Sequence, residues 1–256
     1  MKVNLIPMAG MGSRFLKEGF NIPKPLIQVS GQPMILKAAQ SLPEADKWIF
    51  VCQQSHLTNS PLSEILKEQY PGCIIIPIDH ITEGQACTCL MAEEFINKED
   101  SLMIGACDNG MTWDADKFNS LCEDINVNAL IFTFRHNVTV KRHPEMYGWV
   151  KIDKDNFVQE TSVKIPISAD PINDHAIVGS FWFRRAGDFF DRVKEMMTKD
   201  ARINNEFYVD KVFDFFISSK LNVKVFEIEK YICWGTPNDL RTYKYWEEYF
   251  NKTALK

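Results

Sequence analysis

The sequence has no long hydrophobic run and no closely paired cysteines. None of its apolar stretches approaches the roughly 18 residues of a membrane-spanning helix. The opening MKVNLIPMAG is too short an apolar run for a signal peptide. The seven cysteines, an odd number, show no C-x-x-C spacing. We therefore expect reduced, mostly buried thiols and a cytoplasmic protein with no membrane partner.

An excess of positive charge, internal repeats and linker-like stretches are also missing. The net charge of −5 argues against a nucleic-acid partner, although it leaves room for a local basic pocket. No Pro/Gly/Ser-rich segment divides the 256 residues. A chain of this length can bury a substantial core without disulfides or metals. We expect one domain, residues 1–256, with two halves that meet near residue 135.

Short apolar strands alternate with helical patterns in the first half. The expected strands are 3–8, 48–52, 73–78, 102–105 and 129–134. The expected helices are 34–41, 62–68, 85–95 and 115–123. Strands separated by helices in this way indicate βαβ units on a mostly parallel sheet.

The second half changes character. YGWVKID and NFVQETSVK alternate like antiparallel strands around a turn at 154–156, and AIVGSFWFR is a further strand. Helices are expected near 188–197 and 206–218, then a strand at 223–228 and a last helix over 237–250. The aromatic stretch YKYWEEYF in that last helix favours an amphipathic helix packed on the core over an interface stripe. The whole pattern predicts an α/β fold, a Rossmann-like mixed sheet flanked by helices.

A glycine-spaced loop follows the first strand. Gly10 and Gly12 lack a Cβ, so their N–H groups can approach a phosphate closely at the carboxyl end of the sheet. Arg14 adds a forked donor set for phosphate oxygens. A plain turn with a solvated arginine would look similar. A dinucleotide loop is disfavoured because Phe15 stands where G-x-G-x-x-G needs a small residue, and because no clear helix is expected to follow.

Three further segments carry candidate binding chemistry. Pro23 and Pro25 bracket Lys24, and we expect them to hold it extended and aimed in one direction, although an exposed loop lysine is the simpler alternative. Asp108 follows the strand 102–105, at the end of a strand where ligands of open sheets bind. A carboxylate at this position suits Mg²⁺, although a turn-forming aspartate is the simpler alternative. The segment 83–86, EGQA, opens a helix whose N-terminus can meet a ligand, and Gln85 offers a donor and an acceptor to a base edge. An ordinary helix start would look the same.

These features, in this order, resemble the sugar-nucleotidyltransferase superfamily. Its pattern is a G-x-G-[ST]-R loop, then P-K-P, then a small-residue helix start, then an aspartate that closes a strand. Downstream, the similar segments are Tyr147-Gly148, Lys164 after FVQETSV, AIVGSFWF with Gly179, NNEFYVDKVFD and WGTPNDL. The resemblance covers about residues 3 to 241 and implies the nucleotide-diphospho-sugar transferase fold.

The resemblance implies a reaction in which a nucleoside triphosphate and a small phosphorylated acceptor give an NDP-acceptor and pyrophosphate. The first half, about 1–135, would bind the nucleotide and the second half, about 136–256, the acceptor. The implied catalytic residues are Arg14, Lys24 and Asp108, with Asp108 also holding Mg²⁺, or Mn²⁺ in its place. The implied nucleotide-binding residues are Met8, Ala9, Gly10, Gly12, Ser13, Gly84, Gln85 and Ala86. The implied acceptor-binding residues are Tyr147, Gly148, Lys164, Gly179 and Glu206.

Two departures from the family pattern bear on specificity. Cys233 stands where the family often has a second metal-binding aspartate, so Asp210, or phosphates and water alone, would complete the metal site. Lys164 lacks its usual Glu and Pro neighbours, which suggests an acceptor other than a standard hexose 1-phosphate. The opening IPMAGMGSRF is most similar to a capsule-type cytidylyltransferase branch.

That branch implies CTP as the nucleotide and a role in capsule or cell-surface polysaccharide synthesis. The specific expectation is L-glutamine phosphate as the acceptor and CDP-L-glutamine as the product. Three alternatives remain: a sugar-1-phosphate nucleotidyltransferase using UTP, dTTP or CTP, a glycosyltransferase of related fold, and a non-catalytic nucleotide-sensing protein.

Overall fold

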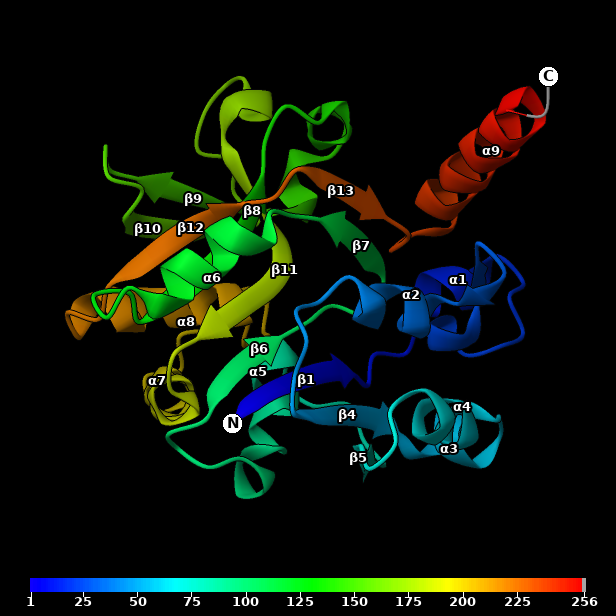
Figure 1. The fold of residues 1–256 in the computed structure, drawn as a ribbon, viewed down its shortest axis with the longest axis horizontal. Coiled ribbons are helices and arrows are strands. Elements are labelled where there is room, and N and C mark those ends of the chain that lie inside the picture. Colours follow the sequence, from blue (N-terminus) through cyan, green and yellow to red (C-terminus); the bar gives the residue numbers. More distant parts are fainter. Residues whose placement is uncertain (255–256) are drawn as a thin grey trace.

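The centre of the protein is a mixed β-sheet with nine strands among residues 1–254, the part of the chain that the computed structural model describes (Figure 1). Seven strands follow the order β10-β9-β11-β6-β1-β4-β5, while β8 pairs with β11 and β12 pairs with β8. Their bounds are β1 (Lys2–Met8), β4 (Lys47–Gln53), β5 (Ile74–Ile78), β6 (Ser101–Ile104), β8 (Ala129–Phe134), β9 (Gly148–Ile152), β10 (Val158–Val163), β11 (His175–Phe183) and β12 (Val223–Glu227).

Four strands of the first half, β6, β1, β4 and β5, pair in parallel. Leu5 of β1 lies opposite Ile49 of β4 on one side and Ile104 of β6 on the other, and all three side chains are fully buried. Burial on both faces explains why these strands read as continuous apolar runs. The strand β11 runs antiparallel to β6, β8 and β9, and it joins the second half to the same sheet. The expected α/β fold with a mixed, mainly parallel sheet is confirmed.

Helices cover both faces of the sheet. On one face they are α5 (Gln85–Leu90), α7 (Ala186–Thr198) and α8 (Val209–Ser218). On the other they are α2 (Met34–Gln40), α4 (Leu62–Gln69) and α6 (Ala115–Glu123), with the short α3 (Gln54–Thr58) before α4. The buried residues of α8 recur at positions i, i+3, i+4 and i+7, namely Val209, Val212, Phe213 and Phe216. Each face therefore has its own apolar core.

Several expected elements have different bounds. The helix expected over 85–95 ends at Leu90, and a short 3-10 helix (Glu93–Phe95) follows. The helix expected from 206 begins at Val209, because the preceding residues pair with the start of α5. The opening loop is followed by a short helix, α1 (Ser13–Lys17), contrary to expectation. Gly12, with φ of +62°, accepts the first hydrogen bonds of α1 and lets the chain turn into it.

Two short ribbons were missed entirely. The strand β7 (Asn109–Thr112) pairs antiparallel with β13 (Lys230–Cys233), and β2 (Gln28–Val29) pairs with β3 (Gln32–Pro33). Each is at most four residues long, and the β7–β13 pairing joins segments about 120 positions apart, so no local pattern reveals it. The β7–β13 pairing bears on the candidate site, because it brings Cys233 opposite Asn109, the residue after Asp108.

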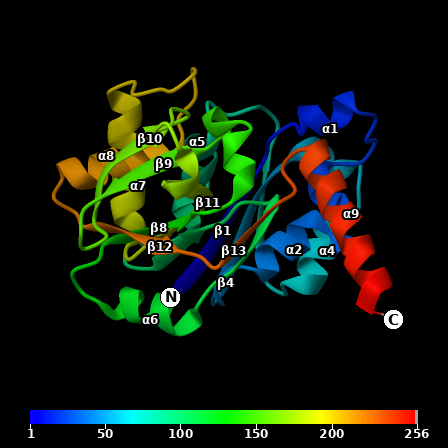
Figure 2. The ribbon, with the colours of Figure 1, turned by 90° about the horizontal axis from the view of Figure 1, so that it is seen from above.

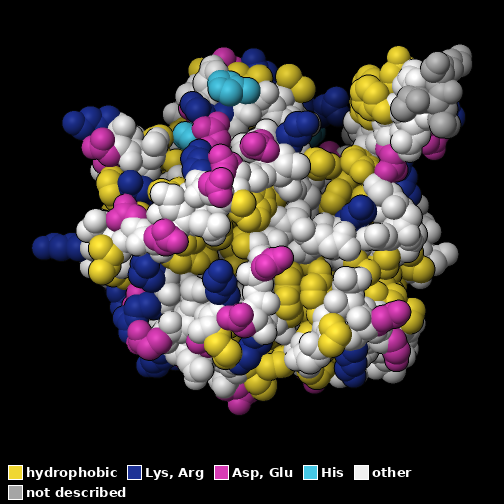
Figure 3. All heavy atoms as spheres, viewed as in Figure 1, with side chains coloured by type: hydrophobic (Ala, Val, Ile, Leu, Met, Phe, Trp, Pro, Cys, Tyr) yellow, Lys and Arg dark blue, Asp and Glu magenta, His cyan; other side chains and the backbone are white. Residues whose placement is uncertain are grey.

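The last helix, α9 (Pro237–Ala254), does not pack on the core along its length, as the sequence analysis expected. Figures 1 and 2 show it leaving the body beside α1 and α2. Leu240 is buried near its start, but the aromatic side chains Tyr245, Trp246, Tyr249 and Phe250 are between 48% and 64% exposed. They stack on one another, and hydrophobic side chains gather over this helix in Figure 3. None of the described helices has the length and apolar character of a membrane span.

Candidate functional site

A cleft of about 340 Å³ opens at the carboxyl ends of β1 and β6. Ligands of open α/β sheets bind at this edge, because the loops that follow parallel strands converge there. The cleft is lined by Pro7, Met8, Ala9, Gly10, Gly12, Lys24, Pro25, Ile81, Thr82, Gly84, Gln85, Thr88, Ala106, Cys107, Asp108 and Glu206. Nine of the residues predicted from sequence are therefore in its wall, and they come from both halves of the chain.

The glycine loop is held in place by a residue that the sequence analysis overlooked. Gln53, at the end of β4, is buried, and its side-chain amide donates to the carbonyl oxygen of Ala9 at 2.6 Å. In the structure it fixes the loop that begins at Gly10, which leaves the backbone of that loop facing the cleft.

Lys24 and Asp108 form an ion pair across the cleft. The Nζ of Lys24 lies 2.5 Å from the Oδ2 of Asp108, and the two side chains are 18% and 30% exposed. Burial alone lowers the pKa of Lys24, but the Asp108 carboxylate outweighs it and holds that pKa above its usual range. The two strongest opposite charges of the cleft thus neutralise each other in the free protein.

Lys24 reaches this position from a turn and not from extended backbone. Residues 24–26 form one turn of 3-10 helix, in which Leu26 N–H donates to the carbonyl of Pro23 and Ile27 N–H to that of Lys24. The expectation that the two prolines hold Lys24 extended is therefore wrong. Proline fixes φ in both conformations, so it gives Lys24 a defined direction but does not select extended backbone. A Cβ added at Gly12 would lie only 3.1 Å from the Cβ of Lys24, so the loop and the turn are closely packed.

Asp108 lies beside Cys233, as the β7–β13 ribbon requires. Gly235 packs close to the Asp108 carboxylate, and its N–H donates to the Sγ of Cys233 at 3.4 Å. Burial raises the pKa of the Cys233 thiol to about 12, so it remains protonated at neutral pH. Among the described residues no three His, Cys, Asp or Glu side chains form a metal cluster. A single carboxylate, Asp108, fits Mg²⁺, which commonly takes one or two carboxylates and fills its other positions with phosphate oxygens and water.

The second expected ligand, Asp210, belongs to another part of the site. Its Oδ2 lies against Gly148, where a Cβ would approach it to 2.2 Å, so this position requires glycine. Burial raises the pKa of Asp210 to about 6, and the nearby ammonium of Lys164 lowers it only in part. The suggestion that Asp210 completes the metal site is not supported, because it faces Lys164 instead of Asp108.

Lys164, which the sequence analysis expected to bind the acceptor, lies near Asp210 and is not among the lining residues of the cleft. It has φ of +64°, its Nζ donates to the carbonyl oxygen of Met146 at 2.7 Å, and its backbone N–H donates to Tyr147. Burial lowers the pKa of Lys164, while Asp210 raises it. Arg14, exposed on α1, is close enough to lower that pKa further, so the two cations face the same space.

The other predicted residues have mixed placements. Glu206 is exposed and lines the cleft, and Gly179 of β11 lies near Ala106 of the cleft wall. Ser13 is exposed on α1. Ala86 is fully buried behind the cleft wall. Its N–H donates to the carbonyl oxygen of Phe207, so this amide is not free to bind a ligand. Thr82 and Thr88, which the sequence analysis did not single out, also line the cleft.

The cleft wall combines the backbone of the glycine loop and one lysine, Lys24, with the carboxylates of Asp108 and Glu206. Arg14 and Lys164 are not among its lining residues. It contains no histidine, and therefore no Ser-His or Cys-His pair, among its lining residues within 1–254. Such a site can bind a polyphosphate and balance charge in a displacement at phosphorus, but it cannot activate a side-chain nucleophile through an imidazole base.

Comparisons with known proteins agree with this geometry. The fold is similar to that of a nucleoside-diphosphate-sugar pyrophosphorylase from Vibrio cholerae RC9, with a TM-score of 0.76 and 20% identity over 94% of this chain and 98% of that one. It is also similar to the inositol-1-phosphate CTP transferase from T. maritima, with a TM-score of 0.72 and 14% identity over 95% and 94% of the two chains. No curated protein matches the sequence. The model of the nucleotidyl transferase family matches residues 3–209, which include the glycine loop, Lys24, Asp108 and Glu206, and the chain belongs to this family.

Proposed function

We propose that this nucleotidyltransferase joins CTP to a small phosphorylated acceptor that also carries an ammonium group, L-glutamine phosphate being the specific candidate. A phosphate oxygen of the acceptor attacks the α-phosphorus of the triphosphate, the bond from that phosphorus to the bridging oxygen breaks, and pyrophosphate leaves. The attacking oxygen is already anionic, so no general base is needed. This fits a cleft without histidine.

The roles of the residues follow from their places. The backbone of Gly10 to Gly12 cradles the triphosphate at the sheet edge, and Lys24 moves from Asp108 to the α-phosphate. Arg14, whose guanidinium is exposed on α1, meets the leaving pyrophosphate. These cations offset the repulsion between two anions, which is the main barrier to the reaction.

Asp108 is the residue that would hold a divalent cation. When bound, Mg²⁺ would offset the negative charge that develops on the phosphate groups. Only one protein carboxylate is at hand, and the neighbouring Cys233 thiol stays protonated. The proposed metal site is therefore completed by the nucleotide and by water.

The acceptor class rests on the charges around Lys164. The ammonium group of Lys164 suits an acceptor phosphate. The Asp210 carboxylate is buried and has no ion-pair partner within 4 Å among the described side chains, and the Glu206 carboxylate is exposed at the cleft. A largely buried carboxylate gains most from a ligand that brings N–H donors and positive charge. A phosphorylated amino acid supplies both, whereas a hexose 1-phosphate brings only hydroxyl groups.

Two observations support CTP as the nucleotide: the capsule-type form of the opening loop, and the fold similarity to the inositol-1-phosphate CTP transferase from T. maritima. The test is pyrophosphate release, screened over four nucleoside triphosphates against sugar, amino-acid and alcohol phosphates. We expect the highest turnover with CTP and an ammonium-bearing acceptor. Best turnover with a hexose 1-phosphate and UTP or dTTP would replace this proposal by the sugar-1-phosphate function. Nucleotide binding without pyrophosphate release would indicate a non-catalytic protein.

A further inference from the structure

The segment 203–208, which connects α7 to α8, carries Glu206 into the cleft through an unusual turn. Ile203 and Glu206 exchange two backbone hydrogen bonds of 2.9 Å each. Between them, Asn204 and Asn205 both have left-handed backbone, with φ of +49° and +64°. Asparagine adopts this backbone more readily than other non-glycine residues, and two of them in succession form a tight turn. The turn is local, so the position of the Glu206 carboxylate in the cleft depends on how the segment is fastened to its neighbours.

One fastening is made by the backbone of Phe207. Its N–H donates to the carbonyl of Glu83 at 2.7 Å, and its carbonyl accepts from the N–H of Ala86 at 3.0 Å. Gly84 lies between, and a Cβ there would come within 2.6 Å of the Phe207 backbone. The 203–208 segment is thus hydrogen-bonded to the start of α5, which is the proposed nucleotide side of the cleft.

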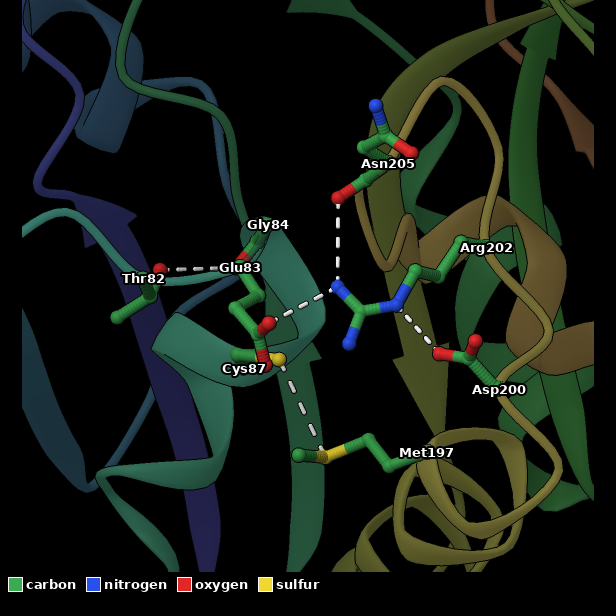
Figure 4. A network of polar contacts seen from close by, with 8 residues as sticks. All are labelled: Thr82, Glu83, Gly84, Cys87, Met197, Asp200, Arg202 and Asn205. Carbon is green, nitrogen blue, oxygen red and sulfur yellow. Dashed lines mark hydrogen bonds and ion pairs between the residues drawn. The ribbon is translucent and has the colours of Figure 1, made fainter.

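The second fastening is made by Arg202 (Figure 4). Its Nη1 donates to the Glu83 carboxylate at 2.9 Å and to the carbonyl of Asn205 at 3.4 Å, and its Nε pairs with Asp200. Its guanidinium carbon also lies 4.3 Å from the centre of the Phe207 ring. One side chain therefore contacts the left-handed turn, the residue after Glu206 and the entrance to α5.

We propose that Arg202 is a positioning residue for the acceptor: it fastens the 203–208 segment to Glu83 and so fixes Glu206 in the cleft. This rests on the proposed function, in which Glu206 contacts the acceptor. The α5 side of the contact is held independently, because Thr82 and Thr88 bond to each other and to the carbonyl of Gly84. Loss of Arg202 should therefore loosen the acceptor side and leave the nucleotide side in place.

The chain offers a matched control for this test. Arg185 likewise bridges a glutamate, Glu99, and an aspartate, Asp188, but it lies at the start of α7 and does not line the cleft. In a pyrophosphate-release assay, Arg202→Met should raise the KM for the acceptor about tenfold and leave the KM for the nucleotide within about twofold. Arg185→Met should change neither. Equal effects of the two variants, or an unchanged acceptor KM in Arg202→Met, would overturn the proposal.

A double-mutant cycle separates positioning from general loosening. If Arg202 acts through Glu206, adding Arg202→Met to Glu206→Gln should raise the acceptor KM no further. A full additive effect in the double variant would contradict this. Amide hydrogen exchange gives a second readout that needs no turnover: in Arg202→Met the amides of Phe207 and Ala86 should exchange faster, and in Arg185→Met they should not. Absence of pyrophosphate release in the wild type would refute the proposed function, whereas unchanged amide exchange would refute the fastening.

Discussion

Replacement of Lys24 by methionine tests the ion pair at the centre of the site. The change keeps the length of the side chain and removes its charge. In the free protein Lys24 lies 2.5 Å from Asp108, yet the proposed reaction needs Lys24 on a phosphate and Asp108 on a cation. A divalent cation that approaches the free protein must therefore displace an ammonium group from its proposed ligand. We expect Lys24→Met to bind such a cation more tightly and to turn over more slowly.

The magnitude follows from the geometry. Two unit charges about 4 Å apart attract by about 4 kcal/mol at an effective dielectric constant of about 20. Because these side chains are 18% and 30% exposed, solvation and screening leave a net value of about 1–2 kcal/mol. That value corresponds to about tenfold tighter metal binding in the variant. Loss of a positioned cation at the reacting phosphate should lower kcat by about 100- to 1000-fold.

The assay is Mn²⁺ binding to the free protein by electron paramagnetic resonance, with pyrophosphate release measured in parallel. Lys17→Met, which removes an exposed lysine of α1, is the matched control and should resemble the wild type in both. The Asp108 carboxylate is partly exposed, so water can solvate it and the free energy of unfolding should fall by about 1 kcal/mol or less. Unchanged or weaker Mn²⁺ binding in Lys24→Met would refute the competition between ammonium and metal.

Three further predictions use other parts of the site. Gly84→Ala should lower the free energy of unfolding by about 2–4 kcal/mol in urea, because its Cβ would overlap the Phe207 backbone. Gly72→Ala, also at positive φ but in open space, should cost about 1 kcal/mol, and equal losses would contradict the close contact. Burial raises the pKa of Asp210 to about 6, so its carboxylate is neutral below that pH, and the acceptor KM should rise as the pH falls through 6. Asp210→Asn should remove that step, and a step retained in the variant would assign it to another group. Chelation by EDTA should abolish pyrophosphate release and Asp108→Asn should lower it by orders of magnitude; full activity in either case would remove Asp108 from metal binding.

Much of the fold was predictable because its strands and helices can be recognised from local sequence patterns. The strand over Ala129–Phe134 and the helix over Ala115–Glu123 have the expected bounds. A buried parallel strand must be apolar on both faces, and an amphipathic helix must repeat every three to four residues. The short α1 was missed because its start depends on the left-handed φ of Gly12, which the sequence permits but does not require. The aromatic face of α9 looked like a core-packing face, since periodicity does not show whether a partner surface is present.

The residues of the site likewise differ in whether a local sequence pattern reveals them. Gly10, Gln85 and Asp108 were found because each follows a strand or opens a helix, and such positions meet at one edge of a parallel sheet. Lys24 was singled out by the prolines that flank it, and Met8 by the family resemblance. Gln53 and Thr88 gave no comparable pattern, since a buried polar residue can be recognised only from the partner that it meets.

The sequence by itself determined the order of strands and helices, the glycine loop, and the lysine and aspartate that face the cleft, because these depend on residues close together in the chain. Only the tertiary structure decided which distant groups touch. It paired Lys24 with Asp108, placed Cys233 beside that carboxylate, moved Asp210 to the acceptor side and set Arg202 against Glu83. Each of these contacts joins segments more than 60 positions apart, and their charge balance is a property of the folded chain.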